Sequence, residues 1–193
     1  MSIRSQFTGG QVPSSLFTVE FWSTLRQSLH RSGVLAVNFA GALASPASKL
    51  VLSTLLHSFP HCRAFEDNPS SVSNDTIGDD HLLKNLVIFC TPSWFLPVVF
   101  REPTPSDFLP YPSPQIRKKV FQDYPSQEIS LERFKLTKEG EEGGDSDWAR
   151  EQREKWILTK KNSNKLEKEQ YEGTKDHWKA MEKVLLRETW ASW

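Results

Sequence analysis

The stretch that decides the fold is Phe7–Gly41, FTGGQVPSSLFTVEFWSTLRQSLHRSGVLAVNFAG. Its middle part predicts an amphipathic helix, because apolar residues recur there at intervals of four. Ser14 and Ser15 are candidate N-caps of this helix, and Gly33 stands where a helix C-cap favours glycine. The apolar stripe consists of Phe17, Phe21, Leu25 and Leu29, with Trp22 beside it.

A short and almost wholly apolar run follows this glycine. Residues 34–39 read VLAVNF, which is typical of a strand covered on both faces in a parallel sheet. A helix that leads through a tight turn into such a strand forms half of an alternating α/β unit. The sequence therefore predicts an α/β domain organised around this strand.

The next hundred residues supply further elements of the same kind. Ser45 and Pro46 open a second helix, with serine as N-cap and proline at the first helical position. Residues 61–67, HCRAFED, and 85–91, NLVIFCT, are predicted strands. Residues 94–101, WFLPVVFR, contain Pro97 and therefore predict an edge segment or an ordered extension.

These blocks resemble the polyamine synthase family, the spermidine and spermine synthases, which share the Rossmann-like fold of S-adenosylmethionine-dependent methyltransferases. Residues 13–17 match the start of a helix in that family, and residues 33–35 match the start of the following strand. The variants at residues 7–10 and 38–41 are similar to its fungal branch. The resemblance covers most of the chain.

The resemblance implies a partial methyltransferase fold with its last three sheet strands and their covering helices. In that fold the seventh strand inserts between the fifth and the sixth, so the three strands would be neighbours. The strand at residues 34–39 would then lie at the edge of the sheet, where an unpaired apolar strand tends to bind another chain.

Three regions are expected along the chain. Residues 1–102 would form the C-terminal half of the methyltransferase-like or spermidine-synthase-like domain, and 103–147 a proline-rich linker and acidic loop. Residues 148–193 would form a charged helical annex, in which Asn164 and Glu167 predict a capping box. The tryptophans expected to anchor this annex are Trp148, Trp156, Trp178 and Trp190.

The candidate site residues follow from the resemblance. The two turn aspartates of the family fall on Ser5 and Thr8, and a hydroxyl with no nearby base cannot accept a proton as a carboxylate does. No catalytic residue is therefore assigned. Thr8, Gly9, Gly10 and Gln11 occupy the family's substrate-side turn, and either line the substrate pocket or form a plain turn.

The glycine-rich loop that would hold an adenosyl cofactor is not found. The sequence contains no G-x-G-x-x-G. We therefore expect no cofactor to be bound by this chain alone, and the resemblance implies S-adenosylmethionine or decarboxylated S-adenosylmethionine for a full-length family member. The sequence is compatible with a truncated gene model, a degenerate duplicate or a real short isoform.

The implied activity is aminopropyl or methyl transfer by a transferase, with this chain expected to be inactive alone. The alternative is a non-catalytic interaction module that associates with itself or with a partner chain through the edge of the 34–39 strand.

Composition narrows the remaining classes of function. Lys and Arg number 24 and so do Asp and Glu, which argues against nonspecific nucleic-acid binding. No run reaches the roughly 18 apolar residues of a membrane-spanning helix. Cys62 and Cys90 are expected to be two buried free thiols in a reducing compartment, so a cytoplasmic location is predicted.

No metal site and no hydrolase motif is predicted. The carboxylates that end the second strand or lie in the following loop are expected to be solvated, and His57 and His61 to cap a helix or face solvent. These acidic positions are Glu66, Asp67, Asp79 and Asp80, the last two beside His81.

Overall fold

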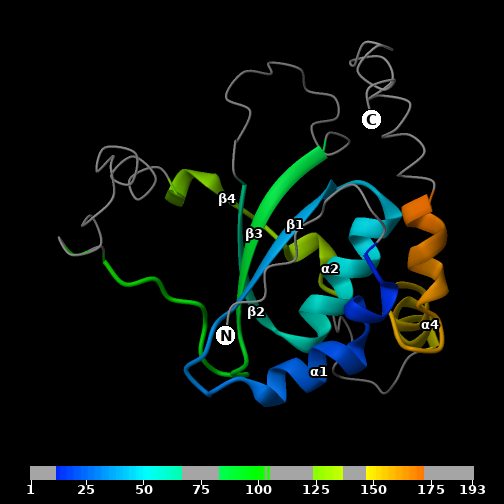
Figure 1. Cartoon of the computed structure of the whole chain (residues 1–193), viewed down its shortest axis with the longest axis horizontal. Coiled ribbons are helices and arrows are strands. Elements are labelled where there is room, and N and C mark those ends of the chain that lie inside the picture. Colours follow the sequence, from blue (N-terminus) through cyan, green and yellow to red (C-terminus); the bar gives the residue numbers. More distant parts are fainter. Residues whose placement is uncertain (1–11, 67–82, 103, 105–123, 137–146, 172–193) are drawn as a thin grey trace, which may run out of the picture.

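A computed structural model describes residues 12–66, 83–102, 104, 124–136 and 147–171. These residues form a mixed α/β structure (Figure 1). The elements in chain order are η1 (Ser14–Phe17), α1 (Val19–Ser28), β1 (Leu35–Ala42), α2 (Pro46–Ser58), β2 (His61–Glu66), β3 (Leu83–Thr91), η4 (Tyr124–Gln127), β4 (Glu128–Ile129), η5 (Glu132–Phe134) and α4 (Asp147–Trp156). A further helix occupies 164–171.

The sheet has the order β1-β3-β2-β4. β3 lies between β1 and β2 and is antiparallel to both, so β1 and β2 run parallel to each other. The predicted insertion of the last strand between the other two is confirmed, as is the place of β1 at the edge. The architecture agrees with the predicted partial methyltransferase-like fold. β4 adds a two-residue strand outside β2.

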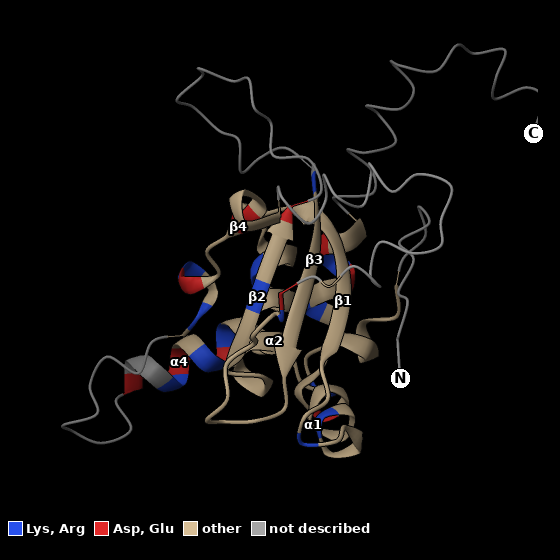
Figure 2. Cartoon of the chain, turned by 90° about the vertical axis from the view of Figure 1, so that its left-hand side faces the viewer, with Lys and Arg blue, Asp and Glu red and all other residues tan. Residues whose placement is uncertain are grey.

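The two faces of the sheet differ in their cover. Alternate residues of β3, from Lys84 to Cys90, are buried on the face that packs against the helices, which lie on one side of the sheet in Figure 1. The expectation that β1 is covered on both faces is wrong, because Asn38 is exposed. Figure 2 looks onto this second face, and few residues of the strands are coloured there as Lys, Arg, Asp or Glu.

An aromatic cluster covers part of the second face. Phe65 of β2 and Phe89 of β3 meet Phe100 and Tyr124, with ring centroids 5.2–6.1 Å apart. The guanidinium of Arg63 lies 5.0 Å from the Phe100 ring. The segment after β3 is thus an ordered extension rather than a strand, as predicted.

Helix ends differ from the predicted ones. Thr18, not Ser14 or Ser15, caps α1 by accepting from the Phe21 amide at 3.4 Å. The helix ends at Ser28, so Gly33 is not its C-cap. Instead Gly33 closes a turn on His30, where a Cβ atom would lie 2.9 Å from the His30 carbonyl oxygen. The predicted start of α2 is confirmed: Ser45 accepts from the Ser48 amide at 3.1 Å.

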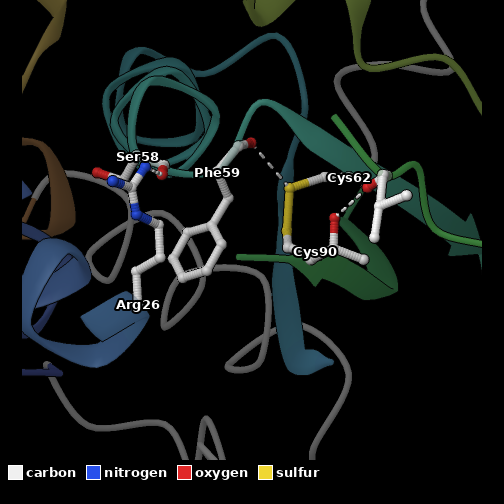
Figure 3. Close-up of a disulfide and its surroundings, with 7 residues drawn as sticks. Arg26, Ser58, Phe59, Cys62 and Cys90 are labelled. Carbon is white, nitrogen blue, oxygen red and sulfur yellow. Dashed lines mark hydrogen bonds between the residues drawn. A yellow bond between two sulfur atoms is a disulfide. The ribbon is translucent and has the colours of Figure 1, made fainter. Parts of the chain in front are cut away.

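The cysteines form a disulfide, so the prediction of two free thiols is wrong. Cys62 of β2 and Cys90 of β3 are directly opposite in the register, with Cα atoms 4.1 Å apart. Figure 3 shows the bond beside Phe59, whose carbonyl oxygen lies 3.3 Å from Cys62 Sγ. Two strand-like runs that place cysteines opposite each other are sufficient to bring the sulfurs together.

The segment after α4 belongs to the core. Ile157, Leu158 and Leu166 are buried, and the Leu158 amide donates to Thr54 Oγ1 at 2.9 Å. Trp156 packs against the core as predicted. The predicted capping box of Asn164 and Glu167 is wrong, because Asn164 is the first residue inside the helix rather than its N-cap; the Glu167 carboxylate accepts from Ser14 Oγ at 2.7 Å. Trp178 and Trp190 lie outside the described residues, and nothing is described for the Trp148 side chain.

Candidate functional site

An apolar groove runs between helix α1 and the edge strand β1. One wall comes from η1 and α1 and the other from β1, and Val12 lies at its start. Asn38 is its one polar residue among the described lining residues. The full lining is Val12, Leu16, Phe17, Phe21, Trp22, Leu25, Leu35, Ala36, Val37, Asn38 and Phe39.

The apolar stripe predicted from the sequence builds the helical wall. Phe17 and Trp22 are buried, whereas Phe21 and Leu25 are half-buried. The Trp22 ring contacts Phe21 edge-on at 5.2 Å between centroids and Phe59 at 6.4 Å. Because Phe59 is fully buried at the end of α2, Trp22 connects the groove to the centre of the core.

Trp22 carries a buried hydrogen-bond donor, which is unusual in a wall that is otherwise apolar. Its indole Nε1 is buried and has no hydrogen-bond partner among the described residues. A buried donor without an acceptor costs about 1–3 kcal/mol, and tryptophan N–H groups usually find a partner when buried. The groove therefore combines apolar walls with one unused hydrogen-bond donor on a lining residue.

The site residues predicted from the sequence lie outside the described residues. Ser5, which takes the place of one family aspartate, is in this segment, as are Thr8, Gly9, Gly10 and Gln11. The next residue along the chain is Val12, and it lines the groove.

Asn38 is the lining residue that sequence reasoning missed as a candidate. It is exposed on β1 and opposite Val87 of β3 in the register. Because side chains alternate along a strand, the Asn38 side chain lies on the second face of the sheet, whereas the buried Leu35 and Phe39 are on the face of the helices. The signal was present in the sequence, because Asn38 is the single polar residue in the run VLAVNF.

The other candidate polar residues do not gather at the groove. Glu66 is buried and pairs with Lys84 at 3.1 Å, so the expectation that it is solvated is wrong. Its partner comes from the adjacent strand β3, which the alternation of the sequence did not reveal. Asp67, Asp79, Asp80 and His81 lie outside the described residues.

His57 and His61, the two histidines near β2, each lie near a charged or polar group of the protein. His57 is exposed, yet desolvation by neighbouring protein atoms, and then the charge of Arg153, lower its pKa from the ordinary value. His61 Nε2 lies 2.8 Å from the Trp94 carbonyl oxygen. The described residues contain no group of three or more His, Cys, Asp or Glu that could hold a metal.

One curated protein aligns with nearly the whole chain. An N-terminal histidine N-methyltransferase of Emericella nidulans is 34% identical over 191 residues, which is 99% of this chain. The chain is similar to a methyltransferase. It spans 31% of the length of that relative. No protein-family model matches the chain, and no solved structure matches it.

This similarity narrows the expected activity. The resemblance implied either aminopropyl or methyl transfer, and the relative is named for methyl transfer. The methyltransferase part of the prediction is therefore supported, and the spermidine-synthase-like part is not.

Among the described residues, no helix is long and apolar enough to span a membrane.

Proposed function

We propose that the chain forms part of an S-adenosylmethionine-dependent methyltransferase that methylates a ring nitrogen of an N-terminal histidine. The observation that carries this proposal is the 34% identity over 191 residues to the Emericella nidulans enzyme. Because the chain spans about a third of that enzyme, we assign the activity to the longer protein. Val12, the residue that follows the predicted substrate-side turn Thr8–Gln11 in the sequence, lines the α1–β1 groove.

The acceptor sets what the longer protein must provide. S-adenosylmethionine, when bound by the longer protein, would supply an activated methyl group. The unprotonated nitrogen of a neutral imidazole would form a bond to this methyl group as its bond to sulfur breaks, leaving a neutral thioether, and the proton on the other ring nitrogen would pass to water. The main requirement on the protein is in-line placement of the two reactants.

Histidine needs less help from a base than an aliphatic amine does. The ordinary pKa of imidazole is about 6.5 and that of a lysine-like amine about 10.4, so at pH 7 the imidazole is largely neutral and the amine is protonated. A polyamine acceptor must lose a proton before it attacks. The hydroxyl residues Ser5 and Thr8 in place of the family aspartates therefore fit a histidine acceptor better than a polyamine acceptor.

A methylation assay with matched peptides tests the proposal. The chain is combined with the part of the Emericella nidulans enzyme that it does not match, and S-adenosylmethionine is supplied. We expect a peptide that begins with histidine to gain one methyl group by mass spectrometry. A peptide with alanine first and histidine inside should gain none. Equal methylation of the two peptides would contradict the assigned acceptor.

The chain alone is expected not to bind the donor. This expectation comes from the missing G-x-G-x-x-G, since that loop and the helix after it hold the adenosyl group in dinucleotide-binding folds. Titration calorimetry of the full chain with S-adenosylmethionine checks it. Tight and saturable binding by the chain alone would overturn the expectation and place the donor site within these residues.

The second candidate function is a non-catalytic interaction module that pairs through the edge of β1. The observation that favours it is the strand itself, LAVNFAGA, which carries no charge. Light scattering combined with size-exclusion chromatography distinguishes this candidate. A monomer with no affinity for other chains would count against it.

A further inference from the structure

The segment that follows β3 exposes three consecutive large apolar side chains. Trp94, Phe95 and Leu96 have 54%, 91% and 61% of their surface exposed. Single exposed apolar residues are common on soluble proteins, but exposed apolar groups that lie together mark a contact with a protein or a membrane. Residues 94–96 are called the apolar tip below.

The apolar tip is attached to the body of the protein. The guanidinium of Arg26, on α1, lies 4.6 Å from the centre of the Trp94 ring. Arg26 also donates to the Ser58 carbonyl oxygen at 3.1 Å (Figure 3). The Trp94 carbonyl oxygen lies 2.8 Å from His61 Nε2 on β2. Because the tip is already held in place, its burial against another surface loses little conformational entropy.

Side chains beside the tip satisfy part of its backbone. Ser93 Oγ accepts from the Phe95 and Leu96 amides at 3.1 and 3.0 Å. Thr91 Oγ1 donates to the Leu96 carbonyl oxygen at 2.7 Å, and the next residue, Pro97, has no amide hydrogen. Unpaired backbone groups are what most oppose the entry of a loop into lipid. These contacts therefore lower the cost of transferring the tip from water into an apolar phase.

The end of the sheet that carries the tip is basic. The turn between α1 and β1 lies at this end, because Leu35 is opposite Cys90 in the register (Figure 1). This turn contains the exposed Arg31, and Arg26 lies against the tip itself. The sequence has no Asp or Glu from residue 21 to residue 65 or from residue 83 to residue 101. The described segments that meet here thus combine exposed apolar groups with cations.

We propose that the apolar tip docks onto the surface of a phospholipid bilayer that contains anionic headgroups. The rings of Trp94 and Phe95 and the Leu96 side chain enter the boundary between headgroups and acyl chains, where tryptophan is favoured because its ring has one polar edge. Arg31 stays at the level of the phosphates and attracts anionic lipid. Such docking needs no helix that crosses the bilayer.

This docking would leave the opposite end of the sheet accessible. The parallel strands β1 and β2 begin beside the tip, at Leu35 and His61, and end at Ala42 and Glu66. Open α/β sheets bind ligands outside the carboxyl ends of their parallel strands. The tip lies at the amino ends, so lipid and substrate would occupy opposite ends of the sheet. The inference concerns the location of the chain and does not depend on which group the enzyme transfers.

Two protein partners fit the tip less well than lipid does. A second copy of the chain would bring its own Arg26 and Arg31 toward the same residues of the first, and like charges repel. A different protein commonly pairs with backbone groups of the loop that it binds. At the tip, Ser93 and Thr91 already occupy part of these groups.

Cosedimentation of the 193-residue chain with lipid vesicles tests the docking. We expect binding to vesicles of phosphatidylcholine with phosphatidylserine, and weaker binding to phosphatidylcholine alone. The double variant Phe95→Ser/Leu96→Ser should bind at least tenfold more weakly, because it removes most of the apolar area of the tip. The matched control is Tyr171→Ser, since Tyr171 is 61% exposed and lies on the C-terminal helix instead. Circular dichroism shows whether each variant is folded.

The charge of the turn gives a second measurement. Arg31→Gln should weaken binding to the phosphatidylserine vesicles about fivefold, as expected for one cation near an anionic surface. The same variant should bind phosphatidylcholine vesicles as the wild type does. Loss of binding to both kinds of vesicle would show that Arg31 acts in folding rather than in attracting anionic lipid.

Tryptophan fluorescence reports whether the tip itself enters the lipid. Phospholipids that carry bromine on their acyl chains should quench the fluorescence of the bound chain. Most of this quenching should disappear in Trp94→Phe, which keeps an aromatic ring and removes one of the seven tryptophans.

Three results would overturn the inference. They are no binding of the folded chain to either kind of vesicle, equal binding of the double variant and Tyr171→Ser, and unchanged quenching in Trp94→Phe. A dimer in solution that the double variant converts to a monomer would assign the tip to a second copy instead. None of these results bears on the methyl acceptor, which the peptide assay tests separately.

Discussion

Individual residues connect the sheet, the helices and the C-terminal segment of this protein. Cys62 and Cys90 join β2 to β3, and Cys90 is fully buried. Disulfides persist in oxidising compartments and are rare in the cytosol. The cytoplasmic location was predicted from two free thiols, so the disulfide removes the basis of that prediction.

Removing the disulfide should lower the free energy of unfolding. The bond closes a loop with a sequence separation of 28 residues, and a loop of this size corresponds to about 3.6 kcal/mol. We expect the Cys62→Ala/Cys90→Ala variant to unfold at lower urea concentration by about that amount. Reductant should destabilise the wild type similarly and leave the variant unchanged. Equal stability of the two proteins without reductant would contradict the bond.

Two neighbouring hydroxyls of α2 should respond in opposite ways. Thr54 Oγ1 accepts from the buried Leu158 amide at 2.9 Å, so Thr54→Val leaves that amide unsatisfied and should cost about 1–3 kcal/mol. Ser53 Oγ is buried without a described partner, so Ser53→Ala should be neutral or stabilising. Urea unfolding of both variants checks this contrast, and a larger loss for Ser53→Ala would contradict it.

Single residues also limited what could be predicted. The N-cap is the residue whose hydroxyl accepts a hydrogen bond from an amide of the first helical turn. The sequence offers three such hydroxyls within five positions, those of Ser14, Ser15 and Thr18. The structure uses Thr18 for α1, while Ser14 binds Glu167. That second contact joins residues 153 positions apart, and no local pattern could reveal it.

At the scale of elements, the strands were the most predictable parts. Residues 34–39, 61–67 and 85–91 were predicted from apolar runs, and each contains most of an observed strand. β4 was not predicted, because its two residues carry no periodicity. It is defined by pairing with β2, where Ala64 and Phe65 are opposite Ile129 and Glu128.

A side-chain pair supports β4 and should make its attachment sensitive to acid. Arg63 Nε and Nη2 donate to Glu128 at 2.7 and 2.6 Å. This hydrogen bonding, together with the charge of Arg63, lowers the pKa of Glu128 below its ordinary value. The stabilisation is therefore present above the unfolded pKa of about 4.3 and is lost as the pH falls through the folded pKa. Because both side chains are partly exposed, we expect a contribution below about 1 kcal/mol.

An NMR titration of the Glu128 carboxyl measures this coupling. Its midpoint should lie below the ordinary value in the wild type and return toward that value in Arg63→Gln. The matched control is Lys135→Gln, which removes a pair with Glu132 rather than with Glu128 and should leave the Glu128 midpoint at its wild-type value. An unchanged Glu128 midpoint in Arg63→Gln would show that the pair does not hold β4.

At the scale of the whole molecule, the sheet order was predicted by resemblance, and the C-terminal packing was not. The order β1-β3-β2 follows the expected insertion of the last strand. The annex was expected to be anchored by tryptophans, and among its described residues Trp156 packs against the core, with Ile157, Leu158 and Leu166 buried as well. The candidate site was predicted in part: its apolar stripe is present, whereas the proposed turn residues lie outside the described part of the chain.

The central claim, methyl transfer to an N-terminal histidine, is tested most directly by competition between donors and acceptors. The chain and the unmatched part of its relative are given labelled S-adenosylmethionine and labelled decarboxylated S-adenosylmethionine, with a histidine-first peptide and a diamine as acceptors. The account predicts a labelled methyl group on the histidine ring and no aminopropyl group on the diamine, by mass spectrometry and NMR. Aminopropylated diamine with an unmodified peptide would contradict it.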